Sequence, residues 1–142
     1  MHIDRADELN RIICTDPEIY YFSIPCSATV RTAGGNHVPA AGKMEPLFVK
    51  RSYQIGAYTG RSAGGIVLGE EWKENDGLVN TVSAMAPSHA PQKKFDSRKI
   101  EPGIWQVLKK YPADHMALQG GLFHKYDVRG FYVKLLSIID SS

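Results

Sequence analysis

The middle of the 142-residue sequence reads Trp72-Lys73-Glu74-Asn75-Asp76-Gly77-Leu78-Val79-Asn80-Thr81. Within it, Asn75-Asp76-Gly77 indicates a tight turn, because asparagine and aspartate side chains bond to nearby backbone groups and glycine accepts a positive φ. Most aspartates in such turns are structural. Asp76 therefore becomes a candidate for chemistry only if a suitable partner, such as a histidine, occurs elsewhere in the chain.

The strongest partner for Asp76 is His115, in the turn Tyr111-Pro112-Ala113-Asp114-His115. It follows Asp76 by 39 residues and precedes a strongly amphipathic segment near the end of the chain. In α/β-hydrolases the catalytic residues run serine, aspartate, histidine along the chain, with the acid and the base on loops toward the C-terminal end. The order of Asp76 and His115 agrees with the last two members of that triad.

Several blocks around these two residues carry a family resemblance. They are Trp72-x-x-Asn75-Asp76-Gly77-x-Val79-Asn80-Thr81-x-Ser83, Pro102-Gly103-Ile104-Trp105, Tyr111, Asp114-His115, Gly120, and Asp127-x-Arg129-x-Phe131-Tyr132-x-x-Leu135. Together they resemble the C-terminal segment of the staphylococcal and thermophilic-Bacillus lipase family. Residues 6–10 and 16–23 are similar to the helix and strand that precede it. The resemblance implies an α/β fold, the C-terminal part of an α/β-hydrolase, with residues 1–142 forming one truncated domain.

The resemblance also implies a function. Asp76 would be the acid and His115 the base of a Ser-Asp-His triad that hydrolyses triacylglycerol-type esters through an acyl-serine intermediate. The nucleophile and the oxyanion-hole amides of the family come from the first half of its fold, which this chain lacks. We therefore expect the isolated chain to be inactive and its partners to be a lipid or ester and the missing N-terminal portion. An extracellular location is implied as well, although residues 1–8 contain no apolar signal core.

Members of the family bind zinc and calcium. We expect this chain to contain no zinc ligands and to have lost or weakened the calcium site. The family's zinc ligands fall upstream of Met1. The histidines that should not be assigned to zinc are His37, His89 and His124. The family's calcium site uses a glycine carbonyl, matched by Gly42, and an acidic residue two positions after the histidine, which here is Ala117. Because calcium prefers several hard oxygen ligands, we expect this site to be lost or much weakened, with Gly42 as a remnant.

A second candidate nucleophile motif, Gly60-Arg61-Ser62-Ala63-Gly64, fits G-x-S-x-G. A nucleophile elbow needs a buried strand before the serine and a helix after it. Residues 54–59 make a poor strand, and residues 65–69 are too short and too glycine-bounded for the helix. We interpret the motif as part of a flexible glycine-rich loop. Two alternatives stay open: a complete small esterase using Ser62, and a non-catalytic interaction or structural fragment of a truncated lipase.

Hydrophobic periodicity predicts several helices. Apolar residues at helical spacing indicate a short amphipathic helix over residues 4–13. Residues 44–56 are mixed and also read as helical, and Pro102 is expected to open a short helix through Leu108. The clearest stripe runs from Val128 to Ile139 and predicts a C-terminal amphipathic helix.

One segment reads as a strand, the aromatic and β-branched residues 20–24. Residues 27–42, 56–69 and 86–99 are rich in glycine, proline and polar residues, and we expect them to be loops. A single strand cannot satisfy its own backbone groups, because both of its edges need partners. The sequence therefore predicts an incomplete sheet and poor stability of the chain by itself.

Composition excludes some classes of function. Hydrophobic residues make up 43% and charged residues 23% of the chain, which is typical of a globular protein. A net charge of +2 gives no reason to expect nucleic-acid binding, and no apolar run approaches the length of a membrane span. Cys14 and Cys26 form no CxxC motif, and their spacing leaves open whether they pair.

Overall fold

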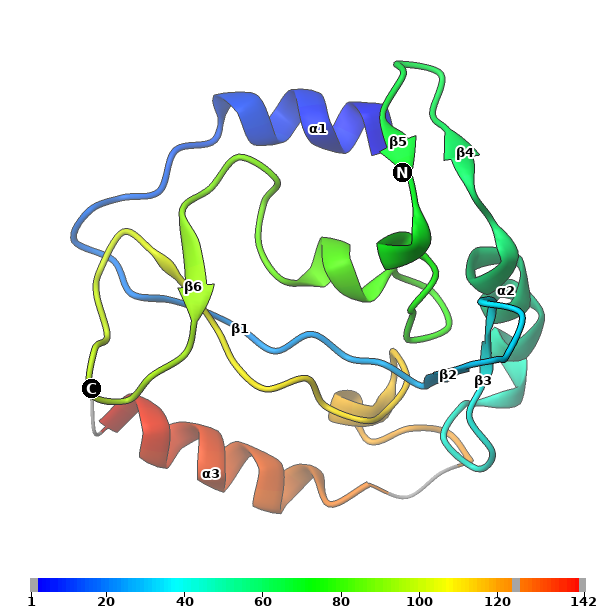
Figure 1. The fold of residues 1–142 in the computed structure, drawn as a ribbon. Helices are drawn as coiled ribbons and strands as arrows, with labels where there is room; N and C mark the ends of the chain where they lie inside the picture. Colours follow the sequence, from blue (N-terminus) through cyan, green and yellow to red (C-terminus); the bar gives the residue numbers. More distant parts are fainter. Residues whose placement is uncertain (1–2, 124–125, 141–142) are drawn as a thin grey trace.

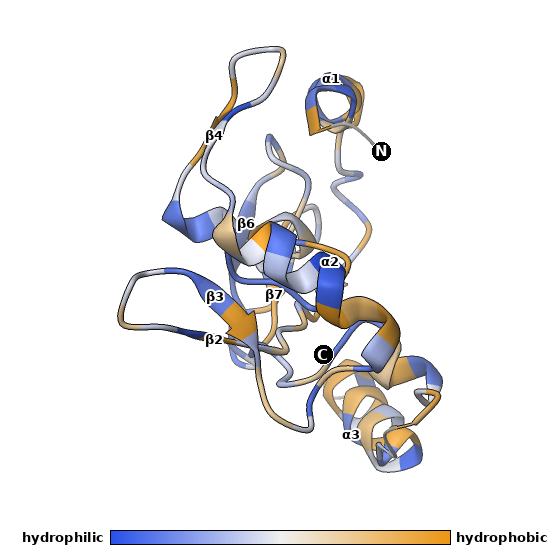
Figure 2. Ribbon diagram, turned by 90° about the vertical axis from the view of Figure 1, so that its right-hand side faces the viewer, coloured by the Kyte–Doolittle hydropathy of each residue, from blue (hydrophilic) through white to orange (hydrophobic). Residues whose placement is uncertain are grey.

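A computed structural model describes residues 3–123 and 126–140 (Figure 1). His124, one of the histidines that should not be assigned to zinc, therefore lies outside the described residues. In both ribbon views helix α1 (Ile3–Ile12) lies at one end of the molecule and helix α3 (Val128–Asp140) at the other (Figures 1 and 2). Helix α2 (Pro46–Ala57) lies between these two levels. The three helices confirm the helices expected over residues 4–13, 44–56 and 128–139.

A parallel sheet of three strands occupies the centre of the fold. Its strands are β1 (Tyr21–Ser23), β6 (Gln92–Lys94) and β7 (Trp105–Val107), in the order β1-β7-β6. Tyr21 and Gln92 both pair with Trp105, from opposite sides of β7. Within the described chain, β1 pairs with no strand on its outer edge. That edge is where a parallel sheet of this kind could be extended.

This sheet corrects the expectation of a single strand. The loop expected at residues 86–99 contains β6, and the helix expected at residues 102–108 is β7. Gly103 explains the second difference, because its φ of +76° interrupts any helix begun at Pro102 and its N–H donates to the Ile19 carbonyl. The backbone after it is therefore extended beside β1.

Two further segments expected to be loops are antiparallel hairpins. Residues 27–42 contain β2 (Thr29–Arg31) paired with β3 (His37–Pro39). Residues 56–69 contain β4 (Gly60–Arg61) paired with β5 (Val67–Leu68), so they are not an unstructured excursion. Short 3-10 helices complete the chain: η1 (Glu70–Trp72), η2 (Thr81–Ala84) and η3 (Ala117–Gln119).

Helix α2 packs against the backbone of the first hairpin. Pro46 opens it, where a missing N–H costs nothing. The buried face of α2 consists of Phe48, Ser52 and Gly56, spaced one turn apart. A Cβ added at Gly56 would overlap the carbonyl oxygen of His37. The glycine therefore allows the helix to approach β3 closely.

The buried core is small and lies beside the N-terminal turns of α2. Ala28, Met44 and Phe48 form it, with Val49 and Met116 packed against them. Helices α1 and α3 contain no buried residue in the described structure, and Figure 2 shows α3 as largely apolar. Cys14 and Cys26 are both free thiols. No helix in the described ranges combines the length and apolarity needed to cross a bilayer.

Candidate active site

The structure places Asp76 and His115 side by side. Oδ2 of Asp76 lies 2.8 Å from Nδ1 of His115. The backbone N–H of His115 also donates to the Asp76 carbonyl oxygen over 3.0 Å. The Asp76 side chain is 8% exposed and the imidazole is 34% exposed. Within residues 3–123 and 126–140 no hydrogen bond reaches Nε2 of His115, so this nitrogen is available to a substrate or nucleophile.

The turn around Asp76 holds its carboxylate in one orientation. Oδ1 accepts hydrogen bonds from the backbone N–H groups of Leu78, at 2.9 Å, and Val79, at 2.7 Å. The other oxygen is left for the imidazole. Gly77 follows with a φ of +98°, and a Cβ on it would come within 2.6 Å of the Cβ of Phe48. The Asn-Asp-Gly sequence thus gives both the turn and the space that the packing requires.

Asn75, which is fully buried, joins this turn to its surroundings through its side-chain amide. Its Nδ2 donates to the carbonyl oxygens of Ser52, on α2, and of Lys73. Its Oδ1 accepts the Gly77 N–H over 2.9 Å. An asparagine amide serves both purposes because it carries a donor and an acceptor on one rigid group. Sequence reasoning identified Asn75 as a turn residue but not as this anchor.

The loop that carries His115 is fastened to the start of α2. Asp114, fully buried, accepts the Glu45 N–H on Oδ2 at 2.6 Å and the Met116 N–H on Oδ1 at 3.0 Å. Glu45 is the N-cap residue of α2 and makes no side-chain cap of its own. The Asp114 carboxylate therefore caps this helix end from another segment, where the helix dipole favours a negative charge.

Phe48 of α2 contacts His115, and Glu45, the residue before the helix, binds the segment that follows the His115 loop. The Phe48 ring meets the imidazole edge-on, with centroids 6.2 Å apart and an interplanar angle of 81°. Glu45, which is fully buried, accepts the N–H groups of Leu122 and Phe123 on Oε1. Sequence reasoning missed Asp114, Glu45 and Phe48 as supporting residues. The aspartate directly before His115 was the one visible signal.

The thiol of Cys26 lies within the electrostatic influence of these carboxylates. Burial raises the pKa of Cys26 to about 11, and the negative charges of Asp76 and Asp114 contribute in the same direction. Because the thiolate is the reactive form of cysteine, a thiol held protonated at neutral pH is a poor nucleophile. Cys26 is therefore no substitute for a catalytic serine.

Ser62 lies in the turn of the β4–β5 hairpin. Its Oγ donates to the carboxylate of Asp4 on α1 and accepts the Ile66 N–H over 3.0 Å. Its backbone N–H donates to the Ile66 carbonyl oxygen, as expected in a hairpin. The G-x-S-x-G sequence thus forms a strand-turn-strand unit, whereas a nucleophile elbow requires a strand-turn-helix. Within the described ranges, Ser62 makes no hydrogen bond to His115.

Two positions that the family resemblance assigns to the calcium site lie among the described residues. Gly42 lies in an exposed turn with a φ of +65°, and Ala117 is fully buried and has no oxygen in its side chain. Position 117 therefore offers no side-chain oxygen where the family resemblance implies an acidic calcium ligand. His37 bonds to Thr29 and His89 to Asp7. Among the described residues, no group of three or more His, Cys, Asp and Glu is placed to hold a metal ion.

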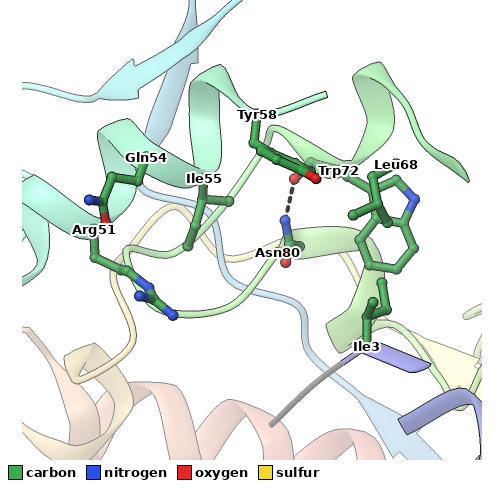
Figure 3. A pocket seen from close by; sticks show the side chains of 8 residues that line it. All are labelled: Ile3, Arg51, Gln54, Ile55, Tyr58, Leu68, Trp72 and Asn80. Carbon is green, nitrogen blue, oxygen red and sulfur yellow. Dashed lines mark hydrogen bonds between the residues drawn. The ribbon is translucent and has the colours of Figure 1, made fainter. Parts of the chain in front are cut away.

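A pocket of about 340 Å³ lies on the other side of α2 from the hairpin β2–β3 (Figure 3). Apolar side chains dominate its wall, among them Ile3, Ile55, Tyr58, Leu68 and Trp72. Arg51 and Gln54 lie together at one end of the group drawn in Figure 3. Neither member of the Asp76–His115 pair lines this pocket. We therefore take the pair, and not the pocket, as the candidate active site.

Comparison with known proteins gives consistent matches. The family described as "Lipase-like, C-terminal domain" matches residues 1–131. "Lipase 1" of Staphylococcus aureus (strain NCTC 8325 / PS 47) is 33% identical over 116 residues, which cover 81% of this chain and 16% of that relative. These matches confirm the resemblance to staphylococcal lipases inferred from the sequence blocks.

Solved structures agree. EstA from Clostridium botulinum superimposes with a TM-score of 0.85 at 26% identity, covering 96% of this chain and 32% of that chain. Staphylococcus hyicus lipase gives a TM-score of 0.79 at 26% identity, covering 98% of this chain and 36% of that chain. The present chain thus spans about a third of the length of these solved structures.

Proposed function

Because the chain belongs to the lipase-like C-terminal domain family, we propose that it supplies the acid and the base of a serine hydrolase acting on carboxylic esters. The single observation that carries this proposal is the 2.8 Å contact between Asp76 Oδ2 and His115 Nδ1. A buried carboxylate on one imidazole nitrogen selects the tautomer whose other nitrogen can accept a proton. That nitrogen is Nε2 of His115, whose imidazole is 34% exposed.

In the proposed reaction, a serine from outside this chain attacks the ester carbonyl carbon through its Oγ. The serine proton passes to Nε2 of His115, and Asp76 stabilises the resulting imidazolium. Collapse of the tetrahedral intermediate breaks the ester C–O bond, and the leaving alcohol takes the proton from Nε2. Water then repeats the sequence on the acyl-serine: its proton moves to Nε2, the carboxylic acid leaves, and the serine recovers its hydrogen.

The proposal includes an assembly. We infer that residues 1–142 are the C-terminal part of an α/β-hydrolase domain, whose remainder supplies the serine and the oxyanion-hole amides. Two observations support this: the chain covers 32% and 36% of the two solved relatives, and the described sheet has no strand on the outer edge of β1. By the same resemblance we propose a lipid-type ester as substrate and an extracellular location.

The alternative of a complete esterase using Ser62 has less support. Its hydroxyl is engaged by Asp4 on α1, in a hairpin turn that lacks the helix an elbow requires. The alternative of a purely structural fragment has no observation of its own in favour. It also leaves unexplained why the imidazole of His115 bonds to a buried carboxylate while the backbone N–H of His115 bonds to the carbonyl oxygen of the same aspartate.

The test is performed in the hydrolase that contains this chain together with its serine-bearing part. On a short-chain p-nitrophenyl ester, Asp76→Asn should lower kcat by about 10⁴-fold and His115→Gln by about 10⁶-fold, the losses typical of the acid and the base of a triad. His89→Gln is the matched control, since that exposed histidine bonds to Asp7 on the surface. Full activity of His115→Gln would refute the proposal.

A further inference from the structure

Three segments of the chain meet behind the candidate active site. They are the acid segment (residues 74–81), the base segment (residues 110–115) and the middle segment (residues 25–28). The Ala28 N–H donates to the Asn75 carbonyl oxygen over 3.0 Å, and the Ser27 N–H donates to the Tyr111 carbonyl oxygen over 3.0 Å. The backbone of the middle segment therefore binds both of the segments that carry the proposed acid and base.

One carboxylate oxygen joins side chains from the same three segments. Oε1 of Glu74, in the acid segment, accepts the hydroxyl of Ser27 over 2.8 Å and also binds Nζ of Lys110, in the base segment. The Glu74 side chain is 27% exposed and that of Lys110 is 45% exposed. Asp76 lies two residues after Glu74, and His115 lies five residues after Lys110. The Ser27–Glu74–Lys110 cluster thus cross-links the segments at positions close to the proposed acid and base.

The cluster gives the acid and base segments an attachment separate from the one at the candidate site itself. At that site, the His115 N–H donates to the Asp76 carbonyl oxygen over 3.0 Å. A single attachment lets two segments rotate about it, whereas two attachments at different places restrict the rotation. Proton transfer needs its groups within a narrow range of distances and angles, so restricted rotation of these segments favours it.

The carboxylate of Glu74 is ionised at neutral pH. Partial burial raises the pKa of Glu74, but the hydrogen bonds from Lys110 and Ser27 outweigh that effect and bring the pKa below its usual value of 4.5. A partly exposed ion pair of this kind contributes little to the free energy of unfolding. Its loss should therefore be seen in the position of the segments, and so in catalysis, more than in stability.

We propose that the Ser27–Glu74–Lys110 cluster positions the carboxylate of Asp76 against the imidazole of His115. The inference rests on the proposed ester hydrolysis and adds three positioning residues to its acid and base. Without the Lys110 ammonium, the base segment keeps its backbone bonds to the middle segment but loses its side-chain link to Glu74. His115 then spends less time in the orientation in which Nε2 accepts the serine proton.

Kinetics of the complete hydrolase test this proposal. Lys110→Met removes the charge and keeps most of the side-chain length. On a short-chain p-nitrophenyl ester it should lower kcat by about tenfold, within the range that misplaced catalytic groups produce, and leave KM within about twofold. Lys110→Arg keeps the positive charge and should keep kcat within about twofold of the parent enzyme.

The matched control is Lys93→Met. Lys93, on β6, pairs with Glu101, and their side chains are 27% and 55% exposed, so the pair resembles the one in the cluster. Its loss should leave kcat within about twofold, because surface ion pairs contribute little by themselves. Unchanged kcat in Lys110→Met, or an equal loss in Lys93→Met, would overturn the proposal.

A double-mutant cycle tests whether the two charged residues act as one link. Glu74→Gln and Lys110→Met each remove one end of the same contact, so their combination should lower kcat no further than the more harmful single change. Losses that multiply would show that the two residues act independently, and the proposal would be wrong.

Proton NMR gives a readout that does not depend on turnover. The downfield resonance of the proton shared between Asp76 and His115 reports on their hydrogen bond, and it should shift in Lys110→Met but not in Lys93→Met. A purely structural role of the cluster would give a different result: the unfolding midpoint would fall while the resonance of the folded enzyme stayed in place. That outcome would refute the positioning role.

The two proposals can therefore fail separately. Full activity of His115→Gln, together with a resonance that responds to Lys110→Met, would refute the acid–base chemistry and leave the positioning of the pair standing. Activity that depends on His115, with kcat and the resonance both unaffected by Lys110→Met, would refute the cluster and leave the acid–base pair standing.

Discussion

The carboxylate of Asp114 accepts the backbone N–H of Glu45 across 2.6 Å, although 69 residues separate them in sequence. This hydrogen bond joins the loop of the proposed base to the first turn of α2. The same carboxylate also binds the N–H of Met116, within its own loop. The side chain of Asp114 thus holds the loop in place, and the imidazole of His115 makes neither of these hydrogen bonds.

Removing that carboxylate should destabilise the fold. Asp114→Ala would leave the buried N–H of Glu45 without its acceptor, which typically costs about 1–3 kcal/mol for each unpaired group. The free energy of unfolding, measured by urea denaturation, should fall by that amount or more. Asp140→Ala is the control, because Asp140 is exposed at the end of α3 and should change stability by less than about 0.5 kcal/mol. Equal stabilities of the two variants would contradict this account.

Gly77→Ala should be more harmful than another glycine substitution in a left-handed turn. Both Gly77 and Gly42 have positive φ, at +98° and +65°, and a side chain there costs about 1–2 kcal/mol. Only at Gly77 would the new Cβ also press against Phe48, at 2.6 Å, whereas the space around Gly42 is open to 4 Å. The unfolding midpoint should therefore fall further for Gly77→Ala than for Gly42→Ala, and activity should fall with it because Phe48 supports His115.

Stability should depend on pH through His37. Burial lowers the pKa of His37 below its usual value of 6.5, because desolvation disfavours the charged imidazolium. At pH values below 6.5 the unfolded chain therefore binds more protons at this site than the folded chain does. The stability contributed by neutral His37 is fully present above pH 6.5. It is lost as the pH falls through the lower pKa that His37 has in the folded chain. NMR titration should place the His37 pKa below 6.5, and His37→Gln should reduce the loss of stability between pH 7.5 and pH 5.

Ser62→Ala should leave ester hydrolysis unchanged. Its hydroxyl joins the β4–β5 hairpin to Asp4 on α1, so the expected effect is a modest loss of stability of about 1 kcal/mol. Thermal unfolding and a p-nitrophenyl ester assay measure the two quantities on the same sample. A loss of hydrolysis that tracks Ser62, with the fold intact, would favour the small-esterase alternative instead.

The sequence predicted the parts of the fold in which one residue type repeats at a clear period. The stripe from Val128 to Ile139 identified α3, and aromatic residues identified β1. Strand β6 was missed because Gln92-Lys93-Lys94 carries no apolar residue at all. Strand β7 was missed because its central residue, Gln106, is polar, although it is fully buried with its amide bonded to backbone carbonyls.

Some residues of the candidate site were likewise predicted from the sequence, and others were not. Asp76 and His115 were predicted because side-chain chemistry, chain order and family blocks all pointed to them, and the structure places them in contact. Asp114 and Glu45 were not predicted as supports. Their partners are backbone N–H groups of Glu45, Leu122 and Phe123, far away in the chain. Since every residue offers such a group, no pattern of side chains can reveal which pairs will meet.

The outer edge of β1 has a consequence for handling the protein. Within the described sheet, β7 lies on one side of β1 and no strand on the other, so part of its backbone can act as a template for any extended chain. Until another strand occupies this edge, two copies can join there. Purified by itself, the chain should therefore gain β-structure and mass as its concentration rises, whereas co-production with the proposed serine-bearing part should keep it dispersed.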